Sequence, residues 1–364
     1  MISEHLLSIV RCPDCRETLR RAEGPAGRVP LACTSCGRYY DSPADYLDLR
    51  PVRAYVEQTK YLDEALHADA RHERVSPPLL GSRIRNDMLR DFLAPRPGEL
   101  VVDLGCGSGR TLLWNRDLGA TMAGIDIAPY FSREARQQVD LLLGDLRKLP
   151  FADGTVDKAW SLDVLEHLSP EALAGMLAEA SRVLKPGGSL FVYTHVRKNA
   201  PIAVGLRWIN RAARQLERWG LIDLRQEHLR KSDHLNPLRD VPHLEQVVAT
   251  AGFRIARIRF YTPIVGGVVE NILMRLAEHA MARRAAARHA AGREKPDAAY
   301  EPVREARMAA KARIARGGAT YAALRVLSLA MKLDLLLFGR ITSGPFFALL
   351  VKKSTGDSDL RVAN

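Results

Sequence analysis

Two patterns of apolar and polar positions, one of alternating strands and helices and one of helical spacing alone, divide this chain of 364 residues. Between Glu99 and about Val196, short β-rich runs alternate with segments of helical spacing; the runs are ELVVDLG, TMAGIDI, VDLLLGD, TVDKAWSLDV and SLFVYTH. This alternation is typical of a parallel sheet with helices on both faces. We therefore predict an α/β domain of three layers.

Helical spacing dominates the flanks of this core. The pattern predicts a helical stretch interrupted at Pro77-Pro78; after the core it predicts a helix over Leu238–Ala251, a strand over Arg254–Tyr261, a long basic helical segment and a last strand over Pro345–Lys353. We divide the chain into 1–50, a helical linker or cap 51–98, a core 99–262 with a lid at 197–240, a basic helical insertion 263–340, and a final strand with tail 341–364.

Two of the predicted helices are amphipathic. Within the lid, apolar residues recur at helical spacing between arginines: Val204, Trp208, Ala212, Leu216 and Trp219. Within Gly318–Phe338, the charges of Arg325, Lys332 and Asp334 disfavour a membrane span. One face of that second helix carries Leu324, Leu327, Met331 and Leu335. This pattern suits either a helix buried against its own domain or one lying in a membrane interface.

Four of the five cysteines form two CxxC pairs, Cys12/Cys15 and Cys33/Cys36, with 17 residues between them. Four thiolates at this spacing satisfy tetrahedral Zn²⁺ and leave no open position for a substrate, so we predict a structural zinc ribbon. A redox dithiol is the alternative, although two pairs would be redundant. We expect the ribbon and the α/β domain to have separate cores.

A glycine loop follows the first apolar strand of the core, in the sequence VVDLGCGSGR. Gly105, Gly107 and Gly109 would let the backbone approach a ligand closely, and Asp103 precedes them. The spacing is GxGxG and not the GxGxxG of dinucleotide sites, since position 110 is arginine.

Two further acids end the next strands. Asp126 ends the run GIDI, where it could accept both hydroxyls of a ribose, and Asp145 ends a third strand, where it could accept from an adenine amino group. Ligands of open α/β sheets bind outside the carboxyl ends of strands. Three acids at successive strand ends predict a binding site there.

These motifs resemble those of the class I S-adenosylmethionine-dependent methyltransferases, in particular the group that includes ubiquinone and menaquinone biosynthesis enzymes. The five matching segments are VVDLGCGSGR, GIDI, GDLRKLPFADGTVD, SLDVLEHLSPE and EASRVLKPGGSLFV. The resemblance covers about residues 85–262 and implies a Rossmann-like, mostly parallel sheet of seven strands.

The resemblance also implies the site residues. The methionine part of the cofactor would bind Asp103, Gly105, Gly107 and Gly109. Asp126, with Ile127 beside it, would hold the ribose; Asp145 and Leu146 would hold the adenine, and Leu162 would line the cofactor beneath the reactive centre. His167, in SLDVLEH, is the first candidate catalytic base for a weakly nucleophilic acceptor, and His195, at the end of the fifth strand, is the second.

Residues 1–50 resemble the small zinc ribbons that activate transfer-RNA and protein methyltransferases. The similarity rests on LLSIVRCPDC and LACTSCGRYYDSPADYLDL. It implies a ribbon that stabilises a methyltransferase, here fused to it.

The net charge of +12 favours an anionic partner. We expect a cytoplasmic methyltransferase whose acceptor is small or lipid-like, and peripheral contact with an anionic membrane is a hypothesis beside it. RNA methylation is one alternative, and a non-catalytic cofactor-binding scaffold that activates a partner is another.

Overall fold

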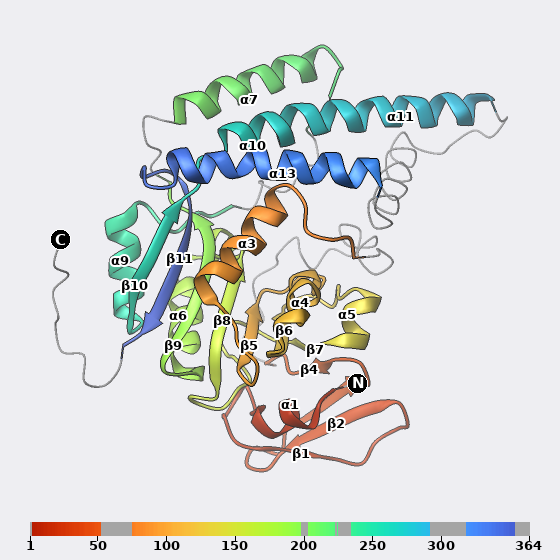
Figure 1. Cartoon of the computed structure of the whole chain (residues 1–364). Helices are drawn as coiled ribbons and strands as arrows, with labels where there is room; N and C mark the ends of the chain where they lie inside the picture. Colours follow the sequence, from red (N-terminus) through yellow and green to blue (C-terminus); the bar gives the residue numbers. More distant parts are fainter. Residues whose placement is uncertain are drawn as a thin grey trace.

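The structure is a computed structural model that describes residues 2–51, 75–197, 203–222, 224, 234–291 and 318–353. Its centre is an eight-stranded sheet in the order β10-β11-β9-β8-β5-β6-β7-β4 (Figure 1). The strands are β4 (Leu47–Asp48), β5 (Leu100–Leu104), β6 (Thr121–Asp126), β7 (Asp140–Leu143), β8 (Val156–Leu162), β9 (Leu184–His195), β10 (Phe253–Phe260) and β11 (Pro345–Lys352). Among these strands β11 is the one that runs antiparallel to its neighbours, β9 and β10.

Helices cover both faces of this sheet. One face packs against α6 (Pro170–Val183) and α9 (Val241–Thr250). The other packs against α3 (Gly81–Leu93), α4 (Arg110–Asn115) and α5 (Arg133–Gln138). Alternate strand residues supply the two cores: Val102 belongs to the first and Val101 to the second. The predicted three-layer, mostly parallel α/β fold is confirmed.

The predicted seven strands are present, and β4 is an additional eighth. This two-residue strand pairs in parallel with β7, Leu47 opposite Leu142, and the amide of Leu49 donates to the carbonyl of Leu143 over 2.9 Å. Such a short strand leaves no periodic signal in the sequence, which is why the pattern did not predict it.

The N-terminal ribbon consists of α1 (Glu4–Ile9) and a three-stranded antiparallel sheet. Its strands are β1 (Leu19–Arg21), β2 (Arg28–Cys33) and β3 (Tyr39–Pro43). The ribbon is tied to the α/β domain by backbone hydrogen bonds: Arg11 donates to the carbonyl of Pro150, and Ala152 donates to that of Ile9. The amide of Ser3 also donates to the carboxylate of Asp140 over 2.9 Å.

The expectation of separate cores is wrong. A single hydrophobic cluster includes Leu6, Leu31 and Leu47 from the ribbon together with Leu142 and Phe151 from the α/β domain. A ribbon of about 50 residues buries too little apolar surface by itself, and docking on the sheet supplies more. The boundaries of the five segments remain predictions.

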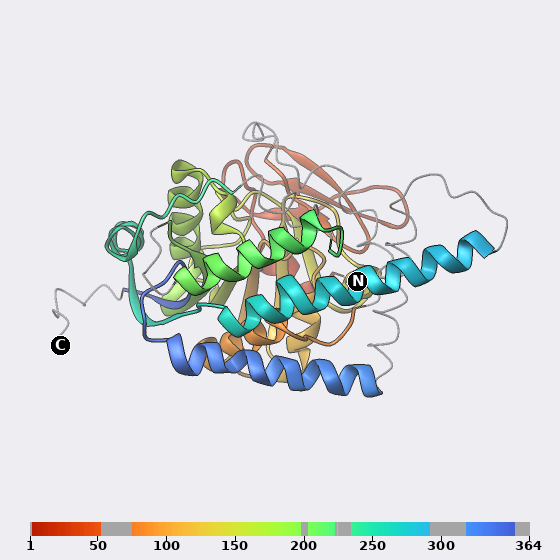
Figure 2. The same ribbon diagram turned by 90° about the horizontal axis from the view of Figure 1, so that it is seen from above.

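A layer of helices lies above the sheet, and we call it the cap layer (Figures 1 and 2). It contains α7 (Ala203–Arg218), α10 (Ile264–Val268), the π-helical turn η4 (Val269–Leu273), α11 (Met274–Ala291) and α13 (Ala319–Phe338). Within the described residues, no helix combines the length and apolar character needed to cross a membrane. The predicted helix before Pro77, the middle of the insertion (292–317) and the tail after Lys353 lie outside the described residues.

The charges that interrupt α13 bind neighbouring helices. Asp334 is fully buried, and its two carboxylate oxygens accept from the amides of Val265 and Gly266 at the start of α10, over 2.9 and 2.8 Å. Lys332 pairs with Asp87 of α3 at 2.7 Å. These contacts fix the rotation of α13 about its own axis.

We expect Leu47→Ala to destabilise the whole chain by about 2–5 kcal/mol, because Leu47 is fully buried between the ribbon and the sheet. Denaturation followed by circular dichroism and tryptophan fluorescence should show one transition, shifted to lower denaturant. Leu336→Ala, at a residue that is 79% exposed, is the matched control and should change stability by less than about 0.5 kcal/mol. Two separate transitions, of which one shifts, would contradict a shared core.

Candidate active site

The loop between β5 and α4 contains the predicted glycine motif. Gly105, Gly107 and Gly109 all have positive φ, at 89°, 53° and 79°. L-residues with a Cβ rarely adopt these angles, so glycine is required for the turn itself. A Cβ at Gly105 would also lie 2.4 Å from a methyl carbon of Val164, whereas a Cβ at Gly107 would meet nothing within 4 Å. The loop therefore presents bare backbone to open space at Gly107.

Asp126, the last residue of β6, holds this loop. One carboxylate oxygen accepts from the amide of Gly107 over 2.7 Å, and the other accepts from the amide of Ala128 over 3.0 Å. A carboxylate has about four acceptor positions, so each oxygen can still accept a hydroxyl of a ligand.

Asp103, the last residue but one of β5, is buried, with 3% of its surface exposed. Burial, with a further contribution from nearby Asp126, raises the pKa of Asp103 to about 8. A cation bound beside this carboxyl would favour its ionised form. The position is therefore suited to a positively charged ligand.

Asp145 follows β7 and is also buried, but its carboxylate already has a partner in this structure. The guanidinium of Arg147 donates to both of its oxygens, over 2.6 to 3.1 Å, and the amide of Arg147 donates as well over 2.9 Å. Contact with an adenine amino group would have to use its remaining acceptor positions. Leu146 and Leu162 are half-buried, and Ile127 follows Asp126 directly.

The sheet order brings these residues together. β8, β5, β6 and β7 are consecutive neighbours, and their carboxyl ends carry Leu162, Asp103, Asp126 and Asp145. This is the edge of an α/β sheet at which ligands bind. The buried acids and the open glycine backbone fit a ligand with a positive charge, a ribose and a base.

A second cluster lies beside this edge, and the sequence predicted its His167 and the neighbouring His195 as candidate bases. Glu166, His167 and His234 have potential ligand atoms within 4.8 Å of one another, and the ring of His195 lies 5.4 Å from that of His234. Glu166 stands next to His167 in the same motif, while His234 is distant in sequence and no motif pointed to it. Two imidazoles and a carboxylate could hold a divalent cation, or one imidazole could accept a proton from a substrate.

Burial, followed by the nearby charge of Asp163, raises the pKa of Glu166 to about 7. Its carboxylate accepts from the hydroxyl of Thr194 over 2.9 Å, and its carbonyl accepts from the amides of Leu235 and Asn236. These bonds attach the segment that carries His234 to the end of β8.

Arg85 is a further residue that the sequence motifs did not reveal, because it lies on α3 outside all of them. Its guanidinium stands 3.5 Å from the carboxylate of Asp163 and 5.4 Å from the ring centre of Tyr193. The positive charge of Arg85 therefore lies against the carboxyl ends of β8 and β9.

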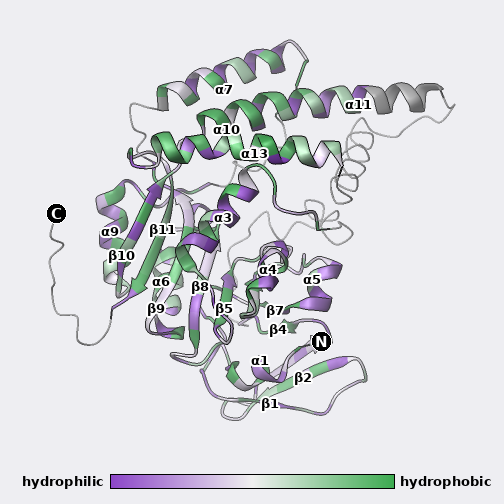
Figure 3. Cartoon of the chain, viewed as in Figure 1, coloured by the Kyte–Doolittle hydropathy of each residue, from purple (hydrophilic) through white to green (hydrophobic). Residues whose placement is uncertain are grey.

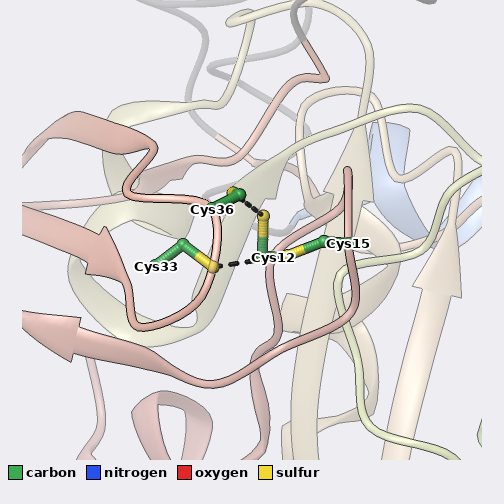
Figure 4. Close-up of side chains that lie close together, drawn as sticks. All are labelled: Cys12, Cys15, Cys33 and Cys36. Carbon is green, nitrogen blue, oxygen red and sulfur yellow. Dashed lines mark hydrogen bonds between the residues drawn. The ribbon is translucent and has the colours of Figure 1, made fainter.

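The four cysteines of the ribbon lie together as the spacing predicted (Figure 4). Their sulfur atoms are within 4.8 Å of one another; the Cys12 and Cys36 sulfurs are 3.8 Å apart, and those of Cys15 and Cys33 are 3.3 Å apart. Tetrahedral Zn²⁺ with bonds of about 2.3 Å requires sulfurs about 3.8 Å apart. The donor set and its spacing fit zinc.

Comparison with known proteins agrees with this geometry. Residues 102–192 match the family model described as "Methyltransferase domain". A ubiquinone biosynthesis O-methyltransferase from Xanthomonas campestris is 36% identical over 140 residues, which are 35% of this chain and 58% of that protein. An uncharacterized 37.1 kDa protein in transposon TN4556 of Streptomyces fradiae is 36% identical over 146 residues, 38% of this chain and 39% of that protein.

Among solved structures, phosphoethanolamine N-methyltransferase 2 of Haemonchus contortus aligns with a TM-score of 0.47 and 15% identity, over 87% of this chain and 62% of that one. The chain spans less than two thirds of each of these proteins. The matches identify residues 102–192 as a methyltransferase domain of the S-adenosylmethionine-dependent class, which confirms the resemblance predicted from the five motifs.

S-adenosylmethionine carries a sulfonium and an ammonium group, so its binding should ionise Asp103 and release a proton. We expect its affinity to rise with pH, by at most about tenfold per unit, between about pH 6 and pH 7.5, above which the ligand's own ammonium begins to lose its proton. Calorimetry in buffers of different ionisation enthalpy measures both the affinity at each pH and the number of protons released on binding. Asp103→Asn should abolish them, and a pH-independent affinity with no proton release would contradict the raised pKa.

Proposed function

We propose that this chain is an S-adenosylmethionine-dependent methyltransferase that transfers the methyl group to a small or lipid-like acceptor. The observation that carries the proposal is the placement of three buried or half-buried carboxylates around an open glycine loop. Asp103, Asp126 and Asp145 end three adjacent strands of a domain that matches methyltransferases.

The cofactor roles follow residue by residue. Asp103 and the loop of Gly105, Gly107 and Gly109 bind the methionine part, and Asp126 with Ile127 binds the ribose. The adenine contacts Asp145 and Leu146, and Leu162 packs beneath the reactive centre. Each of these residues lies at the carboxyl edge of β5, β6, β7 or β8, or in the loop that follows β5.

The cofactor supplies an activated methyl group. The protein therefore needs to align the acceptor with that group and exclude water. His167 lies at the end of the short helix η3 (Leu165–His167), directly after β8, with the rings of His167 and His234 4.7 Å apart. From this position His167 accepts the proton of a weakly acidic acceptor, such as a phenol, as the methyl group is transferred.

The lipid-like character of the acceptor is supported by the cap layer. β10 ends at Phe260 and α10 begins at Ile264, while β11 begins at Pro345, opposite His195 at the end of β9. The apolar helices α10 and α13 therefore stand above the same edge as the cofactor residues (Figure 3). A relative that shares this domain is named as a ubiquinone biosynthesis O-methyltransferase.

The ribbon contributes stability to the enzyme. Cys12, Cys15, Cys33 and Cys36 bind a structural Zn²⁺ in this proposal, since a closed set of four thiolates leaves no position for a substrate. A zinc ion bound there would hold the two CxxC pairs together. β4 and Leu49 extend the sheet at β7.

This function can be tested by incubating the purified chain with methyl-labelled S-adenosylmethionine and with separate small-molecule, lipid, RNA and protein fractions from cells lacking the gene. Label should appear in the lipid or small-molecule fraction. Asp126→Ala should bind the cofactor about 1.5–3 kcal/mol more weakly in calorimetry and transfer correspondingly less label, because a hydrogen bond to a charged group is lost. Asp117→Ala, which removes an exposed carboxylate in the short helix η2 (Arg116–Leu118) before β6, is the control.

Label in the RNA fraction alone would show that the acceptor is RNA and not a small or lipid-like molecule. Cofactor binding with no label in any fraction would favour the non-catalytic scaffold. Unchanged affinity of Asp126→Ala would refute the ribose assignment.

We expect His167→Gln to lower kcat by about 10²–10⁴-fold for an acceptor that must lose a proton, while cofactor affinity stays unchanged. His5→Gln, at an exposed position of the ribbon, serves as the control. An unchanged kcat in His167→Gln would assign the proton transfer to another group.

A further inference from the structure

The outer face of α13 is apolar. Val326, Leu329, Leu333, Leu336 and Leu337 are exposed, with fractions from 46% to 79%. Successive helical residues turn by 100°, so these five side chains fall within about a third of a turn, on one stripe. A stripe of five exposed aliphatic residues is an unusual surface for a soluble helix.

The opposite face of α13 is the one that packs on the domain. Leu324, Ser328, Met331 and Asp334 are buried there, and Leu327 and Leu335 pack beside them. The face carrying Leu327 and Met331, which the sequence pattern offered as either a buried or a membrane face, is thus the buried one. A surface function of α13 has to use the other stripe.

The outer face of α7 is basic and aromatic. Arg207, Arg211, Arg214 and Arg218 are exposed, and within the described part of the chain none of them forms an ion pair with a carboxylate. Trp208 and Trp219 are 62% and 65% exposed. The guanidinium of Arg211 lies 5.1 Å from the ring centre of Trp208.

The two helices are neighbours in the cap layer. α7 packs on α10 at small residues, where a Cβ on Gly205 would lie 3.2 Å from Ile264, and α13 packs on α10 through Asp334. Figure 2 shows α7, α11 and α13 side by side along the top of the molecule. Leu273, at the end of η4 between them, is also exposed.

We propose that the outer face of the cap layer is a docking surface for an anionic lipid bilayer, with the Val326–Leu337 stripe and the two tryptophans inserted at the level of the headgroups and the four arginines paired with lipid phosphates. Apolar and tryptophan side chains beside arginines are the combination that such an interface accommodates. This docking surface goes beyond the proposed function and does not depend on it.

The charges on these helices favour a bilayer over other occupants. Each helix contains one acidic residue: Glu217 of α7 accepts a hydrogen bond from the amide of Leu224, and Asp334 of α13 is buried. Glu270 of η4 and Glu278 of α11 are half-buried and bind the amide of Gly81 and the guanidinium of Arg275. Within the described residues, a second copy of this surface would therefore bring no fully exposed carboxylate to the arginines. RNA would pair with the arginines but would leave the aliphatic stripe of α13 in water.

Sedimentation of the full chain with phosphatidylcholine vesicles, with and without phosphatidylglycerol, tests this surface. Binding should require phosphatidylglycerol and weaken as salt is raised. Leu329→Glu with Leu333→Glu should lower the vesicle affinity by at least about tenfold, because two leucines no longer enter the interface. Arg211→Glu with Arg218→Glu should lower it similarly.

Arg20→Glu with Arg254→Glu makes the same change in net charge at exposed positions outside the cap layer, and should retain most of the binding. Unchanged circular dichroism and cofactor affinity show that each variant is folded. Absence of sedimentation at low salt overturns the proposal, and so does an equal loss in the Arg20/Arg254 variant. Dimerisation or RNA binding that the Leu329/Leu333 variant abolishes, without vesicle binding, would assign the surface to that partner instead.

Discussion

A parallel sheet has its backbone groups satisfied within the sheet, and both of its faces must be covered by apolar helices. Polar side chains of the strands are therefore confined to the strand ends. Ligands of such sheets bind at the carboxyl ends. In this protein that constraint collects Asp103, Asp126 and Asp145 within one edge, where they surround a loop of glycines. The cap layer stands above the same edge, so the proposed docking surface lies next to the candidate site. The ribbon extends the sheet beside β7, away from that edge.

The sequence predicted the parts of the fold that depend on periodicity. The core strands, α9, β10 and β11 lie within a few residues of their predicted positions, because apolar runs and helical spacing report burial directly. The shared core of ribbon and sheet was not predictable in this way. It depends on pairing between residues about a hundred positions apart, such as Leu47 and Leu142, and pairing of that kind leaves no local pattern. The exposed stripe of α13 was missed for a related reason: both faces of that helix are apolar, and hydropathy alone does not tell which one is buried.

The candidate site likewise combines residues that the sequence predicted with residues that it did not. The glycine loop and the acids at the strand ends carry recognisable motifs, since a close backbone approach needs glycine and a strand end has a fixed place in the sequence. Arg85 and His234 come from a helix and a connecting segment without such constraints. The bidentate contact between Arg147 and Asp145 was also hidden, although the two residues are neighbours, because side-chain geometry within a turn is not encoded in spacing.

The position of β11 has a consequence for how the chain reaches this structure. β11 lies between β9 and β10, and it starts 150 residues after β9 ends. On a ribosome, β10 would emerge long before its hydrogen-bonding partner, and β9 would have an open edge during the same interval. Closing so distant a contact is slow relative to local helix formation. The nascent chain therefore passes through a stage with two unpaired strand edges, at which the arginine-rich sequence of β10, FRIARIRF, opposes aggregation until the last strand inserts.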